Sequence, residues 1–338
     1  MRAIVYSETG PSSVLRLAER DLPQPGPGEV RVRLARAGVN PTDWKQRAGG
    51  TYGPLGADAI TPGQDGAGTV DALGEGVSGI AVGDRVWLYL VQHGQPHGTA
   101  AEYAVVPLRK AVPLPDGASF DAGAALGVPA LTAHRALTSG ELTDRIAPGT
   151  MAGQTVLVHG GAGAVGNAAI QLARWAGANV ITTVSSEEKA ALAIEAGAHQ
   201  TVNYRVGDPV TAIRDLAPEG VDLIVDVAPA QNNDLDREVI RNRGTIAIYA
   251  NNGGDELVMP VRATFSKNLR YQFVLLYTVG EDLLARAAED VTAAVAAGAF
   301  GVGEEYGVPL THFALEDAAA AHDAVEGGAI GKVLIDIA

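Results

Sequence analysis

A glycine-rich turn between a short apolar run and a helical pattern is the clearest chemical feature of the sequence. The β-branched run 154–159 predicts a buried strand, and residues 168–176 carry apolar side chains at helical spacing. Between them, Gly161, Gly163 and Gly166 form a G-x-G-x-x-G. Such glycines allow a tight turn, and the start of the following helix attracts phosphate through its N–H groups and dipole. The spacing predicts a dinucleotide-binding loop, with a tight structural turn as the alternative.

The end of the next predicted strand indicates which dinucleotide is bound. Cofactors without a 2′-phosphate usually have their ribose held by an Asp or Glu at this place. Residues 180–184 form the strand, and Ser185 and Ser186 follow it instead of an acid. Lys189 lies one helical turn beyond Ser185 on the same face. Because hydroxyls and an ammonium favour a phosphate, we expect NADPH rather than NADH. Ser186 is also a natural helix N-cap, and both roles can hold together.

Composition excludes several classes of function. The chain has 338 residues, 47% of them hydrophobic, which is enough for two domains with separate cores. It has no apolar run of membrane-spanning length and no secretory pattern at its start, so we expect a cytoplasmic protein. Zero cysteines exclude disulfides and every cysteine-ligated zinc site. The net charge of −14 argues against nucleic acid or an anionic membrane as partner.

The sequence pattern differs between two parts of the chain. Up to about residue 127, short apolar runs alternate with glycine- and proline-rich turns, which predicts a compact, largely antiparallel β domain. After residue 149, strands and helices alternate as in a doubly wound parallel sheet. A last strand, 331–337, either extends that sheet or, as we prefer, returns to the first domain. The predicted fold class is therefore α/β, with a β domain formed by residues 1–127 and 274–338 and a nucleotide-binding domain formed by residues 128–273.

Several short motifs occur in a fixed order along nearly the whole chain: residues 38–43, 61–68, 83–86, 101–103, 158–166, 196–198 with 203–205, and 331–334. In this combination the sequence resembles the medium-chain dehydrogenase/reductase superfamily, specifically its zinc-free quinone oxidoreductase (zeta-crystallin-like) branch. The resemblance implies a GroES-like β-barrel domain beside a Rossmann domain. It also implies hydride transfer from NADPH to quinones or other activated α,β-unsaturated carbonyls. A homodimer joined through the edge of the Rossmann sheet, near a predicted strand at 271–277, is implied as well.

The same resemblance implies roles for individual residues. It places Asn40 in the active site and Lys332 near the cofactor. It assigns contacts with the 2′-phosphate and adenosine to Ser185, Lys189 and Tyr204. The other cofactor contacts it implies lie in the pyrophosphate loop and in two segments that pass the nicotinamide: Gly161, Ala162, Gly163, Ala164, Val165, Tyr249, Ala250, Asn251, Phe273 and Val274.

The sequence predicts chemistry without a metal. No cysteine ligand exists, and residues 63–65 read Gly-Gln-Asp where zinc alcohol dehydrogenases carry Gly-His-Glu. The acceptor must then be electron-poor, such as a quinone or enone, which delocalises the incoming charge onto its oxygen. Candidate hydrogen-bond donors to that oxygen are Asn40, Lys45 and Tyr52. Lys45 stands where well-known quinone reductases have a tyrosine, which leaves the identity of the acceptor open.

These side chains also have structural interpretations. Asn40 favours a turn, Asp43 is typical of a helix N-cap, and Lys45 fits a solvated helical surface. His134 lies in an alanine-rich helical run and is interpreted as a structural histidine, and the histidines of segment 93–97 as loop residues. For the protein as a whole, the alternatives are an enoyl-thioester or 2-alkenal reductase, and an NADPH-binding regulatory or structural protein with little turnover.

Overall fold

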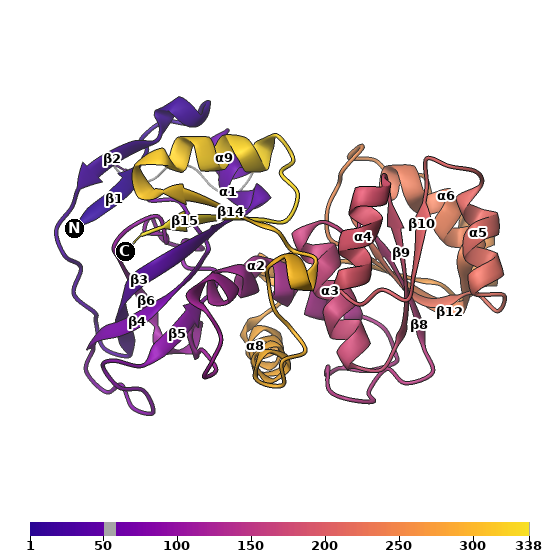
Figure 1. The fold of residues 1–338 in the computed structure, drawn as a ribbon, viewed down its shortest axis with the longest axis horizontal. Coiled ribbons are helices and arrows are strands. Elements are labelled where there is room, and N and C mark those ends of the chain that lie inside the picture. Colours follow the sequence, from indigo (N-terminus) through magenta and orange to yellow (C-terminus); the bar gives the residue numbers. More distant parts are fainter. Residues whose placement is uncertain (51–58, 338) are drawn as a thin grey trace. The chain divides into compact units, whose positions relative to one another are not determined.

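The structure, a computed structural model, describes residues 1–50 and 59–337 (Figure 1). The chain folds into two compact units. Unit 1 consists of Met1–Val128 and Pro309–Ala338, and unit 2 consists of Pro129–Val308. Tyr52 and its neighbours in segment 51–58 lie outside the described residues. Among those that are described, no helix combines the length and the apolar character that crossing a membrane demands.

Unit 1 is built on a mainly antiparallel sheet. Its central strand β3 (Glu29–Val39) pairs with three other strands. The alternating residues Val30, Val32 and Leu34 are at most 1% exposed, because one face of the strand lies in a hydrophobic core. In spatial order the sheet contains β14 (Leu310–Ala314), β15 (Lys332–Asp336), β3, β4 (Asp65–Leu73), β5 (Arg85–Leu88) and β7 (Ala111–Pro113), with β6 (Tyr103–Pro107) paired to β3; β1 (Arg2–Val5) and β2 (Arg16–Glu19) form a separate pair.

The last segment of the chain completes unit 1, as we expected from the sequence. β15 lies antiparallel to β3, and Ile335 enters the same hydrophobic core. Helix α9 (Ala318–Glu326) packs against α1 (Pro41–Arg47). The Arg47 guanidinium, which is fully buried, donates a 2.7 Å hydrogen bond to the Glu326 carboxylate. The C-terminal segment therefore holds α1 in place through both a strand and a helix.

Unit 2 contains a six-stranded parallel sheet. Its central strands are β8 (Thr155–His159) and β11 (Val221–Asp226), and every residue of β11 is buried. Burial on both faces is what a parallel sheet covered by helices requires. The remaining strands are β9 (Asn179–Val184) and β10 (Gln200–Asn203) beyond β8, and β12 (Ile240–Ile248) and β13 (Arg270–Phe273) beyond β11. The helices of this unit are α3 (Ala164–Trp175), α4 (Glu187–Glu195), α5 (Pro209–Leu216), α6 (Pro229–Val239), α7 (Val261–Ser266) and α8 (Glu281–Ala296). Helix α2 (Phe120–Leu137) precedes them in the chain. The predicted α/β fold class is confirmed.

The structure divides the chain after residues 128 and 308, and we predicted domain boundaries after residues 127 and 273. Residues 274–308, which we had assigned to the β domain, belong to unit 2. The reason is their packing against α3. The Gln171 amide group donates to Gly301 O at 3.0 Å and accepts from Gly301 N at 2.9 Å, and Asn167 donates to Tyr306 O at 2.8 Å. The chain therefore returns to unit 1 at residue 309.

The strand predicted at 271–277 is also shorter than expected. β13 ends at Phe273, and Leu276–Thr278 forms a 3-10 turn that leads towards α8. A continuous apolar run does not distinguish an extended strand from a turn that buries alternate residues, so the sequence pattern placed the end of the strand too late.

Candidate active site and cofactor loop

The predicted glycine turn joins β8 to α3. The N-cap of α3 is Gly163, in extended backbone, and no side chain caps the helix. The N–H groups of the first helical turn therefore have no partner within the helix. A Cβ on Gly161 would lie 2.2 Å from Thr182 Oγ1. One on Gly166 would lie 2.3 Å from the carbonyl oxygen of Gly160. Packing of the turn against the protein itself thus requires glycine at both places.

Gly163 has a different reason to be glycine. It is exposed, and a Cβ there would meet no protein atom closer than 3.4 Å. The protein leaves room for a side chain at this point, beside the unpaired N–H groups. A side chain would occupy the space through which a pyrophosphate approaches them. Ala162 is buried, and Ala164 and Val165 are half-buried. The residues of this turn therefore fit the pyrophosphate of a dinucleotide.

The predicted 2′-phosphate residues gather where β9 and β10 end. The Tyr204 N–H donates to Val184 O at 3.1 Å, which places Tyr204 beside the start of the segment that contains Ser185. Tyr204 is 48% exposed, and Ser185 and Lys189 are half-buried. Ser186 Oγ accepts from the Lys189 backbone N–H, so its predicted N-cap role is confirmed. The Lys189 ammonium has no hydrogen bond or ion pair with any described residue, and an anion there would be its partner.

The two segments predicted to pass the nicotinamide leave adjacent parallel strands. The Tyr249 N–H donates to Asp226 O at 3.1 Å, and the Val274 N–H donates to Ile248 O at 2.7 Å. Burial first, and then the Asp226 carboxylate, raises the pKa of Tyr249 above its ordinary value. Ala250 is half-buried, Asn251 is exposed and bonded to the Asp255 carboxylate, and Phe273 is 60% exposed. All five predicted residues therefore lie at the carboxyl ends of β12 and β13, the edge at which such sheets bind ligands.

In unit 1, Asn40 lies at the centre of a buried hydrogen-bond network. Its side-chain Nδ2 donates to Asp65 Oδ2, and its Oδ1 accepts from Lys332 Nζ, both at 2.7 Å. Its backbone N–H donates to Asp43 Oδ2 at 2.7 Å, which forms a capping box at the start of α1. The helix N-cap is therefore Asn40, and Asp43 is the third helical residue rather than the N-cap that we expected. Asn40 therefore has a structural role where the chain turns into α1, as we predicted.

The side-chain ammonium of Lys332 is part of this hydrogen-bond network. It is 2% exposed, donates to Asn40 Oδ1 and to Val39 O at 3.3 Å, and lies 3.8 Å from Asp65 Oδ2. Burial lowers the pKa of Lys332, and Asp65 and Asp43 oppose that change. Two of its three N–H groups therefore have hydrogen-bond partners, and the Asp65 carboxylate forms an ion pair with the ammonium. The geometry therefore makes Lys332 a residue that positions Asn40, and contact with the cofactor stays a prediction.

The two carboxyl groups of the network hold protons more tightly than usual. Burial raises the pKa of Asp43 to about 7, and the neighbouring Asp65 adds to the effect. Burial likewise raises the pKa of Asp65 to about 6, against the opposing charge of Lys332. Asp43 Oδ1 is buried without a hydrogen-bond partner among the described residues. Asp65 had no predicted site role, although its place in the 63–65 motif was a signal.

Lys45 lies on the same short helix as this network. It is half-buried, and its Nζ lies 5.9 Å from the centre of the Trp44 ring. His134 has the structural role we expected, because its Nε2 lies 2.8 Å from Asp290 Oδ2 in the interior of unit 2. Burial lowers the pKa of both His93 and His97. Asn40 thus caps α1 and Lys45 lies within it, and the third predicted donor, Tyr52, lies outside the described residues.

Comparison with known proteins identifies the family. Residues 26–116 match the alcohol dehydrogenase GroES-like domain, and residues 164–293 match the zinc-binding dehydrogenase domain. Quinone oxidoreductase of Rattus norvegicus is 32% identical over 341 residues, which cover 99% of this chain and 97% of that protein. The chain belongs to the zinc-free quinone oxidoreductase branch of the medium-chain dehydrogenases/reductases. The resemblance and the predicted GroES-like and Rossmann domains are confirmed.

Other proteins similar to this chain include enzymes that are described by a different activity. A 2-haloacrylate reductase of Burkholderia sp is 30% identical over 342 residues, with 99% of this chain and 98% of that protein covered. The crystal structure of Escherichia coli quinone oxidoreductase complexed with NADPH has a TM-score of 0.81 at 26% identity, covering 99% of this chain and all of that one. The crystal structure of an NAD-dependent alcohol dehydrogenase has a TM-score of 0.86 at 32% identity over the full length of both chains.

Gln64 and Asp65 belong to the motif that replaces the Gly-His-Glu of zinc alcohol dehydrogenases, and both bond to other residues of unit 1. Asp65 accepts from Asn40 Nδ2 and, with both oxygens at 2.9 Å, from the Val128 N–H. Gln64 is buried, and its Nε2 lies 3.4 Å from Gln92 Oε1. An amide and a carboxylate that satisfy each other provide a rigid, polar surface that can orient a hydrogen-bond donor.

The raised pKa of Asp43 makes the stability of unit 1 depend on pH. Between about pH 4 and pH 7 the folded protein keeps a proton on Asp43 that the unfolded chain has released, so raising the pH through this window destabilises the fold. Asp43→Asn should remove this contribution, which amounts to at most about 1.4 kcal/mol for each pH unit crossed. Thermal unfolding midpoints measured across the window check this. Asp116→Asn, at an exposed acid of the same unit, is the control, and equal slopes for both variants would contradict the prediction.

Proposed function

We propose that this protein is an NADPH-dependent oxidoreductase of the quinone reductase type, acting in the cytoplasm on quinones or other activated α,β-unsaturated carbonyls without a catalytic metal. The observation that carries the proposal is similarity over 99% of the chain to quinone oxidoreductases at 32% identity. The glycine turn of unit 2 supports it, because the open space at Gly163 suits a pyrophosphate. NADPH, when bound, supplies the hydride.

The cofactor would be held by residues at one edge of the parallel sheet. We assign the pyrophosphate to the turn from Gly161 to Val165, and the 2′-phosphate to Ser185, Lys189 and Tyr204. The ammonium of Lys189, which pairs with no described residue, is the main support for a phosphate there, because this acidic chain must supply local positive charge to an anionic cofactor. The nicotinamide side is assigned to Tyr249, Ala250, Asn251, Phe273 and Val274.

On the acceptor side, the residues of α1 would supply hydrogen bonds rather than a metal charge. We assign Lys45 as donor to the acceptor oxygen, where negative charge accumulates as the hydride arrives. Asn40, held by Lys332 and Asp65, would keep one amide hydrogen for the same task or set the position of α1. Tyr52 remains a proposed donor. Water would deliver the final proton.

A second candidate function is reduction of an activated C=C bond in an enoyl-thioester or 2-alkenal. The relative described as a 2-haloacrylate reductase favours it, because an acrylate is an activated alkene. The same residues would serve both reactions, since hydride adds at a carbon conjugated to a carbonyl in each. A protein that binds NADPH for regulation, with little turnover, is the alternative from another class.

We also propose a homodimer joined through β13, the edge strand of the unit 2 sheet. Apolar side chains are exposed on and around this edge, including Phe273 at 60%, Leu275 at 43% and Phe265 at 58%. An uncovered edge strand of this character invites pairing with another strand. A second copy of the chain would cover it and pair its free backbone groups.

Consumption of NADPH with a panel of acceptors tests the proposed function. We expect turnover with 1,4-benzoquinone or 9,10-phenanthrenequinone, measured by loss of NADPH absorbance, and the comparison with an alkenal and crotonyl-CoA decides between the two candidates. Lys45→Met should lower turnover, with little change in NADPH affinity, if its ammonium supports the acceptor oxygen. Tight NADPH binding without turnover on any acceptor would favour the regulatory alternative, and unchanged turnover in the variant would remove Lys45 from the mechanism.

The choice of NADPH over NADH should depend on Lys189. A hydrogen bond to a charged group contributes about 1.5–3 kcal/mol, so Lys189→Ala should weaken NADPH binding roughly 10- to 100-fold and leave NADH binding nearly unchanged. Isothermal titration with both cofactors measures this ratio. Glu188→Ala, at an exposed neighbour in the same helical turn, is the matched control and should not weaken NADPH binding. An equal loss for both cofactors would show that Lys189 does not recognise the 2′-phosphate.

The dimer proposal predicts that a charge on the exposed edge separates the subunits. Leu275→Glu should produce monomers, because a buried carboxylate would face the apolar edge of the second copy. Val206→Glu is the control: Val206 is 70% exposed and follows β10, which is the opposite edge strand of the same sheet. Sedimentation velocity distinguishes the species. A monomeric parent protein, or a dimer that persists in the Leu275→Glu variant, would refute this interface.

A further inference from the structure

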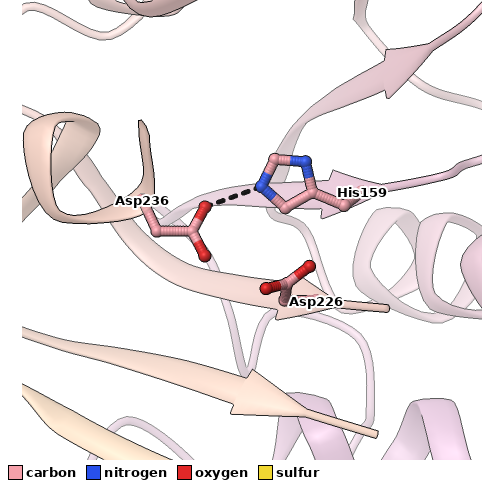
Figure 2. A group of neighbouring side chains, drawn as sticks. All are labelled: His159, Asp226 and Asp236. Carbon is pink, nitrogen blue, oxygen red and sulfur yellow. Dashed lines mark hydrogen bonds and ion pairs between the residues drawn. The ribbon is translucent and has the colours of Figure 1, made fainter. Parts of the chain in front are cut away.

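A second buried polar cluster lies in unit 2, outside the residues assigned above. Figure 2 shows its three side chains: His159 at the end of β8, Asp226 at the end of β11 and Asp236 in α6. His159 is 2% exposed, and both aspartates are fully buried. One potential ligand atom from each side chain lies within 4.8 Å of the other two. Among the described residues, these three metal-ligating side chains form the group that lies close enough together to hold a metal ion.

Neighbouring groups fix the orientation of two of the three side chains. His159 Nδ1 lies 2.8 Å from Thr183 Oγ1, which leaves Nε2 directed at Asp236 Oδ1, 2.7 Å away. Asp226 Oδ1 accepts from the Ala228 N–H at 2.9 Å and from Asn232 Nδ2 at 2.7 Å. Histidines and carboxylates that bind metals are held in this way, by hydrogen bonds from the atoms that do not face the ion.

The remaining oxygen of each carboxylate receives no hydrogen bond from a described N–H or hydroxyl group, and the two carboxyl groups lie close to each other. Asp226 Oδ2 and Asp236 Oδ2 are both buried and lack a hydrogen bond among the described residues. Within the described chain, neither aspartate forms an ion pair with lysine or arginine. Two carboxylates therefore share one imidazole and no fixed cation. A buried oxygen without a partner destabilises the fold, and more so when it is charged, so this arrangement favours a ligand that bonds to both oxygens.

The other buried His–Asp pair of unit 2 shows what a complete cluster looks like. Asp290 bonds to His134 through Oδ2, accepts from the Ile146 N–H at 2.8 Å, and pairs with Arg145 through Oδ1. Both of its oxygens are satisfied, and the arginine neutralises its charge. The His159 cluster has one carboxylate more and lacks the arginine. A bound cation would supply what Arg145 supplies at Asp290.

We propose that His159, Asp226 and Asp236 bind a divalent transition-metal ion such as Zn²⁺. One imidazole nitrogen with carboxylate oxygens is a donor set that such ions accept, and a dication balances the two carboxylates while His159 is neutral. Ligand atoms around tetrahedral zinc lie roughly 3.3 Å apart, so His159 Nε2 and Asp236 Oδ1 would separate by about half an ångström. Because the three residues are buried, the ion is structural: it would join β8, β11 and α6 directly before the glycine turn.

This cluster belongs to unit 2, whereas the 63–65 motif, which stands where zinc alcohol dehydrogenases carry Gly-His-Glu, belongs to unit 1. The cluster also does not depend on the proposed function, since binding of the ion would stabilise unit 2 whether or not the protein reduces quinones. Its test therefore uses metal content and unfolding rather than activity.

The experiment uses the full-length protein without a histidine tag, treated with a chelator and then loaded with Zn²⁺ or Co²⁺. We expect about one ion per chain after desalting, measured by inductively coupled plasma mass spectrometry, and a higher thermal midpoint than in the chelated protein. Co²⁺ should give the visible absorption bands of a low-symmetry site with nitrogen and oxygen ligands. Asp226→Asn keeps the size of the side chain and removes its charge, so it should lose at least about 90% of the bound metal and the metal-dependent shift.

A second variant and a control distinguish loss of the metal site from loss of folding. Asp236→Asn should lose the metal in the same way, and normal far-ultraviolet circular dichroism establishes that each variant is folded. His312→Gln alters a surface His–Asp336 pair and should keep the ion. Less than about one tenth of an ion per chain in the loaded parent protein, or full retention in both cluster variants, would overturn the proposal. If the parent shows no metal response and Asp226→Asn is more stable, the two carboxylates share a proton instead.

Discussion

The bond between the Lys332 ammonium and the Asn40 amide is the interaction on which unit 1 depends. It joins residues 292 positions apart and connects the closing strand β15 to the start of α1. The same ammonium faces Asp65 at the start of β4, so a single buried cation fixes three elements. Gly38 makes this approach possible, because a Cβ there would lie 3.1 Å from Lys332 Nζ and 2.1 Å from Ala124 O. The residues proposed to face the acceptor are therefore positioned by the last segment of the chain.

In unit 2 the proposed function sets a different constraint, because N–H groups must face an anionic cofactor in a strongly acidic protein. The parallel sheet brings the carboxyl ends of its strands to one edge, where the glycine turn, the Ser185 segment and the Tyr249 segment begin. We assign the positive potential for the proposed cofactor to backbone N–H groups and to the ammonium of Lys189. In the His159 cluster, at the end of β8, two carboxylate oxygens have no partner among the described residues. Both features place unbalanced charge next to the same strand, β8.

Elements with strong local signals could be predicted from the sequence, and elements defined by packing could not. Helix α5 starts where the local sequence indicates, because Asp208 caps it and Pro209 is its first residue. Strand β14 was not predicted, since the half-exposed sequence 310–314 becomes a strand by pairing with β15. The boundary of unit 2 at residue 308 depends on the bonds of Gln171 to Gly301, which cross 130 residues. Sequence periodicity carries no information about such contacts.

The sequence by itself determined the strand, glycine turn and helix of the cofactor loop, the serines and lysine that follow β9, and the lack of cysteine ligands. These features are local, so residue type and spacing are enough to state their chemistry. Tertiary structure alone decided that Asn40 is held by Asp65 and Lys332, and that His159 meets Asp226 and Asp236. The ends of these contacts are 25 to 292 residues apart, and burial creates their energetics by removing water from charges that look ordinary in the sequence.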